Sequence, residues 1–481
     1  MRLVWSMSAG EGRIFGGIGP AIRQMKSARS EEKARIALED LIETLYDFET
    51  IIDEEDEKGL RSLIAPLNRR VAPGDSLAIL STRALAAVAS RSAGDPRSLE
   101  HLNQLLSGGT ASESGEAALA ILKLAKIGIG DASSITPLNE MLSSDELEVQ
   151  ANALEALHAL SEMGVGSEMS IAPLNCLASD LNHDIRRRAI ETLYKLCFLE
   201  HGSRSSIGVM NDALADPEDD VKQVAAATLA ELAFLEIGDI SSIPLLNILL
   251  THQNVTIRLA AIEAVSMLAN LEVGDRSSIR ILNRLMGDAS ELVKAKAAMT
   301  LDSMAMMGLG DPSTIHVLNR TLDYDVLAVG ENALNALYSL ESIGVSDPVS
   351  VEHILPFMDR HNGGMDEIAA DLLKALNVDW VRTCPRCRAK DPERLTDGIW
   401  TYNSTQIDYG HGCDDEDCDD DCDDDCGDPD EDDMDLYIGD SSKPHDAQVQ
   451  SPPYWACRKC GYQWPESQEG SEGLGAPDFE E

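Results

Sequence analysis

The chain has 481 residues, which is too long for one hydrophobic core and enough for several domains or one elongated array. Its 39 Lys and Arg stand against 84 Asp and Glu, a net charge of −45 that repels a phosphate backbone and disfavours nucleic-acid binding by the chain as a whole. A hydrophobic fraction of 43% excludes a wholly disordered chain. No uninterrupted apolar run of about 18 residues exists to cross a bilayer.

The cysteines and the N-terminus predict a cytoplasmic protein. Residues 1–19 lack the apolar block of a secretory signal. Only Cys176 and Cys197 precede residue 384, while the other eight cysteines crowd the C-terminal part. A disulfide framework would be spread along the chain, so this clustering points to metal or redox chemistry.

The charge composition resembles that of proteins from salt-loving archaea. Lysine is scarce, with 13 residues against 26 arginines, and carboxylates are abundant. Molar salt shortens the screening length to about 3 Å and so tolerates such a surface. An ordinary acidic protein with an acidic tail has the same composition, and both interpretations stay open.

The first elements in chain order are a lead-in and a cap. We expect residues 1–29 to be flexible and residues 30–58 to form a capping helix followed by an acidic loop. The helix is indicated by Ala34, Leu38, Leu41 and Leu45, which share one helical face. The loop is expected at residues 53–58.

A 36-residue repeat then dominates the sequence. An asparagine that follows an apolar residue recurs after a first step of 35 and then at every 36th residue, at Asn68, Asn103, Asn139, Asn175, Asn211, Asn247, Asn283 and Asn319. The next step reaches Leu355, where the frame persists without the asparagine. Such self-similarity is typical of stacked repeat architectures.

Each repeat unit is predicted to be two helices, A and B. Before the asparagine comes a Gly-Asp-x-Ser-Ser-Ile pattern, as at residues 238–243, where the glycine suits a left-handed helix end and the aspartate suits an N-cap. Helix B has helical spacing, as in Val221, Ala225, Leu229 and Leu232. Two short helices cannot bury their apolar stripes alone, so neighbouring units must stack.

The repeats resemble the HEAT family over about residues 60–380. The match rests on acidic residues in the turn between the helices and basic residues just inside helix B, namely Asp145, Asp216 and Asp288 with Arg186, Lys222, Arg258 and Lys294. The resemblance implies an all-α fold: a right-handed α-solenoid of about nine 36-residue helix pairs over residues 59–380. A shorter lyase-type or armadillo-like subclass stays open, because HEAT units usually exceed this length.

Residues that recur in every unit are interpreted as structural. The asparagine amides are expected to satisfy backbone groups at the inter-helix turn, and the Asp and Arg/Lys ladders to form inter-repeat ion pairs. Function is expected where the units differ, on outward positions of helix B that line the concave face, and His158 is counted among them. The candidate partner-binding residues are Glu155, Glu191, Tyr194, Glu231, Glu263 and Tyr338.

Residues 381–466 are predicted to form a small β module that resembles a zinc ribbon. Two C-x-x-C knuckles, Cys384 with Cys387 and Cys457 with Cys460, supply the four thiolates that one Zn²⁺ takes. The 69-residue spacer between them is longer than usual and contains an acidic insertion at about residues 408–450. Four further thiols there are candidates for a second metal: Cys413, Cys418, Cys422 and Cys426. Residues 467–481 are expected to be an acidic disordered tail.

We therefore expect a non-enzymatic scaffold that grips an unidentified protein partner along its concave face, with a structural zinc ribbon. No catalytic set is apparent among the histidines and cysteines. One alternative is an enzyme related to the HEAT-like bilin lyases, which rests on the resemblance alone. Another is a nucleic-acid-associated factor that uses the arginines and lysines of the knuckles, which appear from the sequence to be the only concentrated positive patch.

Overall fold

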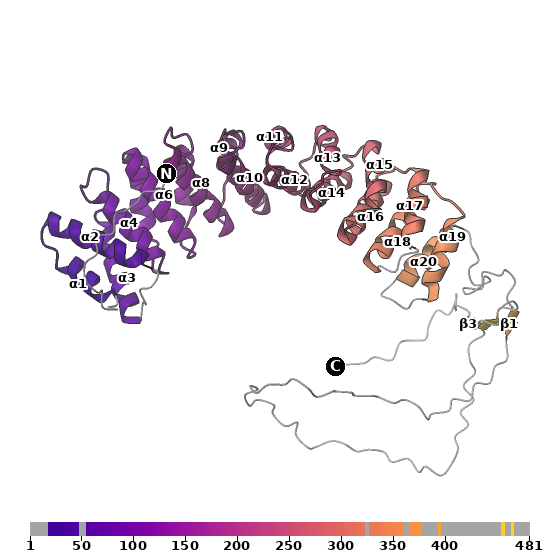
Figure 1. Cartoon of the computed structure of the whole chain (residues 1–481), viewed down its shortest axis with the longest axis horizontal. Coiled ribbons are helices and arrows are strands. Elements are labelled where there is room, and N and C mark those ends of the chain that lie inside the picture. The colour runs from indigo at the N-terminus through magenta and orange to yellow at the C-terminus, as the bar shows by residue number, and fades with distance from the viewer. Residues whose placement is uncertain are drawn as a thin grey trace, which may run out of the picture.

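The computed structural model describes residues 18–47, 54–322, 327–359 and 365–376, together with three short strands at 393–395, 454–456 and 463–465. Its twenty described α-helices follow one another along a curved array, and Figure 1 shows the arc. No strand occurs between residues 18 and 376 in the described ranges. The coarse prediction of an all-helical solenoid is therefore confirmed for this part of the chain.

Nine helix pairs make up the array after the first two helices. In each pair the first helix, A, is short and the second, B, has up to 16 residues. The A helices are α3 (Glu54–Asn68), α5 (Ser98–Gly108), α7 (Ile135–Met141), α9 (Ile171–Leu177), α11 (Ser205–Ala213), α13 (Ile243–Leu249), α15 (Arg276–Leu285), α17 (Pro312–Leu322) and α19 (Ser350–Ile354). The B helices are α4 (Ala78–Ala89), α6 (Ala111–Ala125), α8 (Leu147–Glu162), α10 (His183–Phe198), α12 (Asp219–Phe234), α14 (Val255–Asn270), α16 (Glu291–Met306), α18 (Leu327–Ser342) and α20 (Met365–Ala375).

The N-terminal cap departs from the sequence prediction in two places. Residues of the expected flexible lead-in form helix α1 (Gly19–Ser27), which buries Ala21, Ile22 and Met25. The cap helix α2 (Glu31–Tyr46) follows it. The expected acidic loop is instead the first turn of α3, because four carboxylates at residues 54–57 interact favourably with the positive end of a helix.

Leucine and alanine at fixed repeat positions build the core. The residue before each ladder asparagine is fully buried in helix A, as at Leu138, Leu174 and Leu246. In helix B an alanine recurs every 36 residues with no exposed surface: Ala153, Ala189, Ala225, Ala261, Ala297 and Ala333. Because alanine is small, consecutive B helices approach closely and contact one another along the array.

The ladder glycine has a different role from the one expected. Gly238 does not take the left-handed conformation; that position lies two residues earlier, at Glu236 with a φ of 62°. A Cβ at Gly238 would instead lie 2.9 Å from Leu268 Cδ2 of the next repeat. The glycine is therefore needed for close approach between repeats. The expected aspartate cap is confirmed, since the Asp239 carboxylate accepts a hydrogen bond from the Ser241 N–H at 3.0 Å.

The asparagine ladder joins neighbouring repeats rather than satisfying backbone groups. Each paired amide donates from Nδ2 to a serine hydroxyl that starts the next helix A, as in Asn211 to Ser241 at 3.1 Å and Asn247 to Ser277 at 3.0 Å. The same bond recurs at Asn103, Asn175, Asn283 and Asn319. Each repeat is thereby pinned to its successor.

The ion-pair ladder is present at alternate rungs only. Arg186 reaches Asp216 at 2.7 Å and Arg258 reaches Asp288 at 2.9 Å across repeat boundaries. Lys222 pairs within its own helix, with Asp219 at 2.8 Å, because His252 occupies the place where the neighbouring rungs have aspartate. Lys294 likewise contacts Glu291 at 2.8 Å. The prediction of inter-repeat pairs is thus wrong for these two lysines.

Three short strands lie near the ends of the long cysteine spacer. Strand β2 (Tyr454–Ala456) pairs antiparallel with β1 (Glu393–Leu395) on one side and with β3 (Gln463–Pro465) on the other. Arg394 lies opposite Trp455, which lies opposite Trp464. The eight C-terminal cysteines lie outside the described residues.

Candidate functional site

The B helices line the inner side of the arc. In Figure 1, α10, α12, α14, α16 and α18 follow the inner curve, while α9, α11, α13, α15 and α17 lie outside them. Each B helix packs one stripe against its A helix and its neighbours, so the opposite stripe faces the inner surface. We call this surface the concave stripe; it contains Glu155, Arg187, Glu191, Tyr194, Glu231, Glu263, Asp302 and Tyr338.

Two of the predicted partner-binding carboxylates are already engaged within the stripe. Arg188 contacts Glu155 at 2.6 Å and Glu191 at 2.7 Å, so it bridges α8 and α10. Arg187 holds the other oxygen of Glu191 at 2.6 Å. This end of the stripe is therefore a charge-balanced network in which neither Glu155 nor Glu191 is a free anion.

The stripe becomes acidic over α12 and α14. Burial first, and then the nearby Glu263 carboxylate, raise the pKa of Glu231, which makes no ion pair with any described residue. Burial also raises the pKa of Tyr194, with smaller contributions from Glu231, Cys197 and Glu263. Glu263 is paired with Lys296 at 2.7 Å. Tyr194 thus lies beside two carboxylates that share a single lysine.

Further along, the stripe carries polar and aromatic groups. Asp302 accepts a hydrogen bond from the Ser339 hydroxyl at 2.5 Å; burial nevertheless raises the pKa of this carboxyl, because the hydrogen bond offsets only part of the desolvation. Tyr338 is exposed on α18. These groups lie on three successive B helices and could contact different parts of one long partner.

His158 does not belong to the exposed stripe, contrary to the sequence prediction. Only 8% of the residue is exposed, and its Nδ1 lies 3.3 Å from the Thr192 hydroxyl of α10. Burial, and then the positive Arg188, lower its pKa. The position sits where α8 packs on α10, so the ring fills the inter-helix space instead of facing solvent.

Sequence reasoning missed two features whose spacing was visible. On the outer side, α15 carries Arg276, Arg280 and Arg284 four residues apart on its exposed face, so the ribbon knuckles are not the only positive cluster. At the edge of the concave stripe, Phe198, Phe234 and Met306 end their B helices and are exposed. The 36-residue frame would have aligned these three apolar residues.

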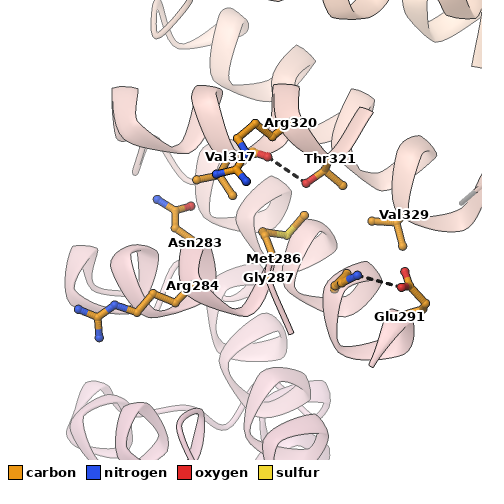
Figure 2. Close-up of a pocket in the computed structure, with 10 residues that line it drawn as sticks. Asn283, Arg284, Met286, Gly287, Glu291, Val317, Arg320, Thr321 and Val329 are labelled. Carbon is orange, nitrogen blue, oxygen red and sulfur yellow. Dashed lines mark hydrogen bonds and ion pairs between the residues drawn. The ribbon is translucent and has the colours of Figure 1, made fainter. Parts of the chain in front are cut away.

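The main cavity in the described part lies between α15, α16, α17 and α18 and has a volume of about 340 Å³ (Figure 2). Its lining includes Arg284, Arg320, Thr321 and the Glu291–Lys294 pair. The Thr321 hydroxyl donates to the Val317 carbonyl at 2.9 Å, as Figure 2 shows, and is not held by a base. This lining offers no pairing of a nucleophile with a general base.

Metal and membrane features are absent from the described residues. No group of three or more His, Cys, Asp or Glu side chains there is placed to hold a metal ion. Cys176 and Cys197 are free thiols, and burial raises the pKa of Cys197 to about 12. Among the described helices, none is both long and apolar enough to span a membrane.

Comparison with known proteins identifies the repeat type. No curated protein sequence matches the chain. A solved structure of importin beta in an ammonium sulfate condition is similar at 15% identity and a TM-score of 0.40, over 72% of this chain and 51% of that one. The chain thus spans about half of that structure. The family model for HEAT repeats matches residues 135–230 and 207–302. The central pairs of the arc, from α7 to α16, are therefore HEAT repeats.

Proposed function

We propose that the protein is a non-enzymatic scaffold that binds a protein partner along the concave stripe. The carrying observation is that the repeat-invariant polar side chains are used up in joining repeats, while the stripe varies from helix to helix. A stripe of unlike residues spread over α8 to α18 offers many separate contacts to one extended partner. Interfaces of this kind gather their affinity from a few well-placed aromatic and charged residues.

The charges of the stripe favour a partner with basic groups. Glu231 is the carboxylate that desolvation penalises while no described cation faces it, and Glu263 shares its lysine with this acidic region. A partner Lys or Arg placed beside Glu231 would relieve both penalties. Tyr194 and Tyr338 supply aromatic contact area on either side of this region.

The proposal is tested by a concave variant combining Tyr194→Ala, Glu231→Gln and Tyr338→Ala. Glu191 is left intact, since its loss would strand Arg187 and Arg188. A matched control on helix A, Glu140→Gln with Asp212→Asn and Ile248→Ala, changes similar groups on the outer side. Partners captured from native lysate are compared by mass spectrometry. Loss of a partner from the concave variant alone supports the proposal, and identical recovery from both variants contradicts it.

We further propose that residues 381–466 form a zinc ribbon with Cys384, Cys387, Cys457 and Cys460 as ligands. The pairing of β1 with β2 supports this, because β1 begins six residues after Cys387 and β2 ends immediately before Cys457. The two knuckles are thereby tied to one small sheet despite the long spacer. Four thiolates at this spacing are the donor set that structural zinc takes.

Metal analysis of the reduced, zinc-replete protein tests the ribbon. One Zn per chain is expected, falling to zero in Cys457→Ser with Cys460→Ser. The control, Cys413→Ser with Cys418→Ser, should keep that one zinc. About two Zn per chain, with one lost in the control, would assign the second metal to the acidic insertion. No zinc in the unmodified protein contradicts both sites.

A further inference from the structure

An apolar row lies at one edge of the concave stripe, where the B helices end. Phe198, Phe234 and Met306 are the last residues of α10, α12 and α16, and are 57%, 73% and 73% exposed. They occupy the same repeat position, so they fall on one line along the array. We call this line the edge row.

The exposed phenylalanines are unusual for this chain. It contains six phenylalanines, and among the described residues the third, Phe357, is buried in the core. Phe198 is held in place by Tyr194, whose ring meets it edge to face at a centroid distance of 4.9 Å. An aromatic ring fixed at the surface loses little conformational freedom when a partner covers it, which is the property of a binding anchor.

Carboxylates flank the edge row on both sides. In the turns that follow α10, α12 and α14, Glu200, Glu236 and Glu272 adopt left-handed φ angles of 62°, 62° and 59°. Gly128 and Gly308 occupy this position in other repeats, and glycine takes it without steric cost. Glu231 lies on the other side of the row, in the concave stripe. Three adjacent repeats therefore present an exposed acid exactly where the backbone would favour glycine.

The cations near the edge row do not cancel this charge. Lys195 on α10 and Arg204 after it are the closest in sequence, and Arg204 is taken by Asp239 at 2.9 Å. Neither Glu200, Glu236 nor Glu272 forms an ion pair with a described residue. The row is thus an apolar line between two sets of negative charges.

We propose that the edge row binds a basic amphipathic helix of a partner protein. Consecutive helix pairs are about 8–10 Å apart, which matches two turns of an α-helix, about 10.5 Å. Apolar residues at positions i and i+7 of the partner would meet Phe198 and Phe234, and one at i+21 would meet Met306, since Asn270 interrupts the row. Lys and Arg on both flanks would face the glutamates.

This inference rests on the proposed scaffold function and specifies where the partner is anchored. The probe is a synthetic helical peptide with leucine at i, i+7 and i+21 and flanking lysines, and its counterpart with glutamate for lysine. Binding of each to the full chain is followed by fluorescence anisotropy at two salt concentrations. The variants are Phe198→Ala with Phe234→Ala, and Glu200→Gln with Glu236→Gln and Glu272→Gln. The control is Leu181→Ala with Ile248→Ala, which removes equally exposed apolar residues elsewhere.

We expect the basic peptide to bind at least ten times more weakly to each edge-row variant and unchanged to the control. The glutamine variant should also lose part of the salt dependence. Equal binding of the acidic peptide, or full binding by the Phe variant, overturns the inference. If the native partner is lost from the Tyr194–Glu231–Tyr338 variant but kept by the Phe variant, the edge row fails while the scaffold function stands. If it is kept by both, both fail.

Discussion

Single side chains decide whether each rung between repeats is complete. Asn139 is the exception in the ladder: neither its Nδ2 nor its Oδ1 has a hydrogen-bond partner among the described residues. The serine that receives this bond elsewhere is replaced by Met169, which is 63% exposed. A buried amide without partners is a cost that the other repeats avoid.

Met169→Ser should therefore stabilise the protein by about 1 kcal/mol, the usual net value of one hydrogen bond. Urea unfolding measures the change. Met169→Ala is the control, because it removes the same exposed side chain without supplying a hydroxyl. Equal stability of the serine and alanine variants would show that Asn139 gains nothing from a partner.

The buried His158 makes stability depend on pH. Burial and Arg188 hold its folded pKa below the unfolded value, and they outweigh Glu162, Glu191 and Glu155, which act in the opposite direction. The folded state thus binds fewer protons than the unfolded chain. This contribution is complete above about pH 6.5 and is lost as pH falls through the folded pKa.

His158→Gln should flatten the stability profile between about pH 7 and pH 5, since glutamine does not titrate. Urea midpoints at a series of pH values follow the change. His183→Gln is a suitable control, because that histidine is exposed at the start of α10. A profile that keeps its slope in His158→Gln would place the acid sensitivity in other groups.

At the scale of helices, the two kinds of ion pair should differ in their contribution to stability. Arg258 and Asp288 join adjacent repeats with side chains that are only 12% and 11% exposed, and Arg258 also donates to the carbonyls of His252 and Gln253. The Lys222–Asp219 pair lies within one helix, with a half-exposed carboxylate. Low exposure reduces screening by water and salt.

Asp288→Asn is expected to lower the free energy of unfolding by roughly 2 kcal/mol, as for a charged hydrogen bond. Asp219→Asn should cost less than about 0.5 kcal/mol. Chemical denaturation compares the two, and hydrogen exchange in α14 and α15 locates the effect. If both changes cost the same, the inter-repeat rung has no special weight.

The helix pattern was predictable from the sequence, but the partners of its residues were not. Apolar spacing identified the B helices, since Val221, Ala225, Leu229 and Leu232 are all buried. The role of Gly238 was mistaken because glycine suits both a left-handed turn and a close contact, and only packing distinguishes them. The isolated Lys222 could have been foreseen, because His252 stands one step away where aspartate was required.

The concave stripe was predictable only in part for a similar reason. Helical phase placed Tyr194 and Glu231 on the right face. It could not show that Glu191 is consumed by two arginines, since that depends on side chains of α8 and α10 meeting in space. It also placed His158 outward, because one helical step separates an exposed from a buried position.

At the scale of the whole array, the alanine ladder sets how closely the B helices stack. Ala261 has no exposed surface between α12 and α16. Ala261→Leu would force extra volume into this contact and should destabilise the protein by about 1–3 kcal/mol. Because each repeat contacts its neighbours, the damage should stay local and separate unfolding into two phases.

Denaturant unfolding followed by circular dichroism checks for the second phase, and small-angle scattering checks whether the arc changes its curvature. Ala227→Leu on the exposed stripe of α12 is the control and should leave both unchanged. A single sharp transition with a uniform loss of stability would mean that the array unfolds as one cooperative body.

The asparagine bond that spans 30 residues from one repeat to the next also makes the length of the protein adjustable. Excising residues 203–238 would join Gly202 to Asp239 and bring Ser241 to the place of Ser205 opposite Asn175, so the shortened chain keeps its register. Such an excision should yield a folded arc with one helix pair fewer, whereas removal of six residues fewer should not. Evolution could have lengthened or trimmed the molecule by the same duplication and loss of single units, fitting its reach to whatever it holds.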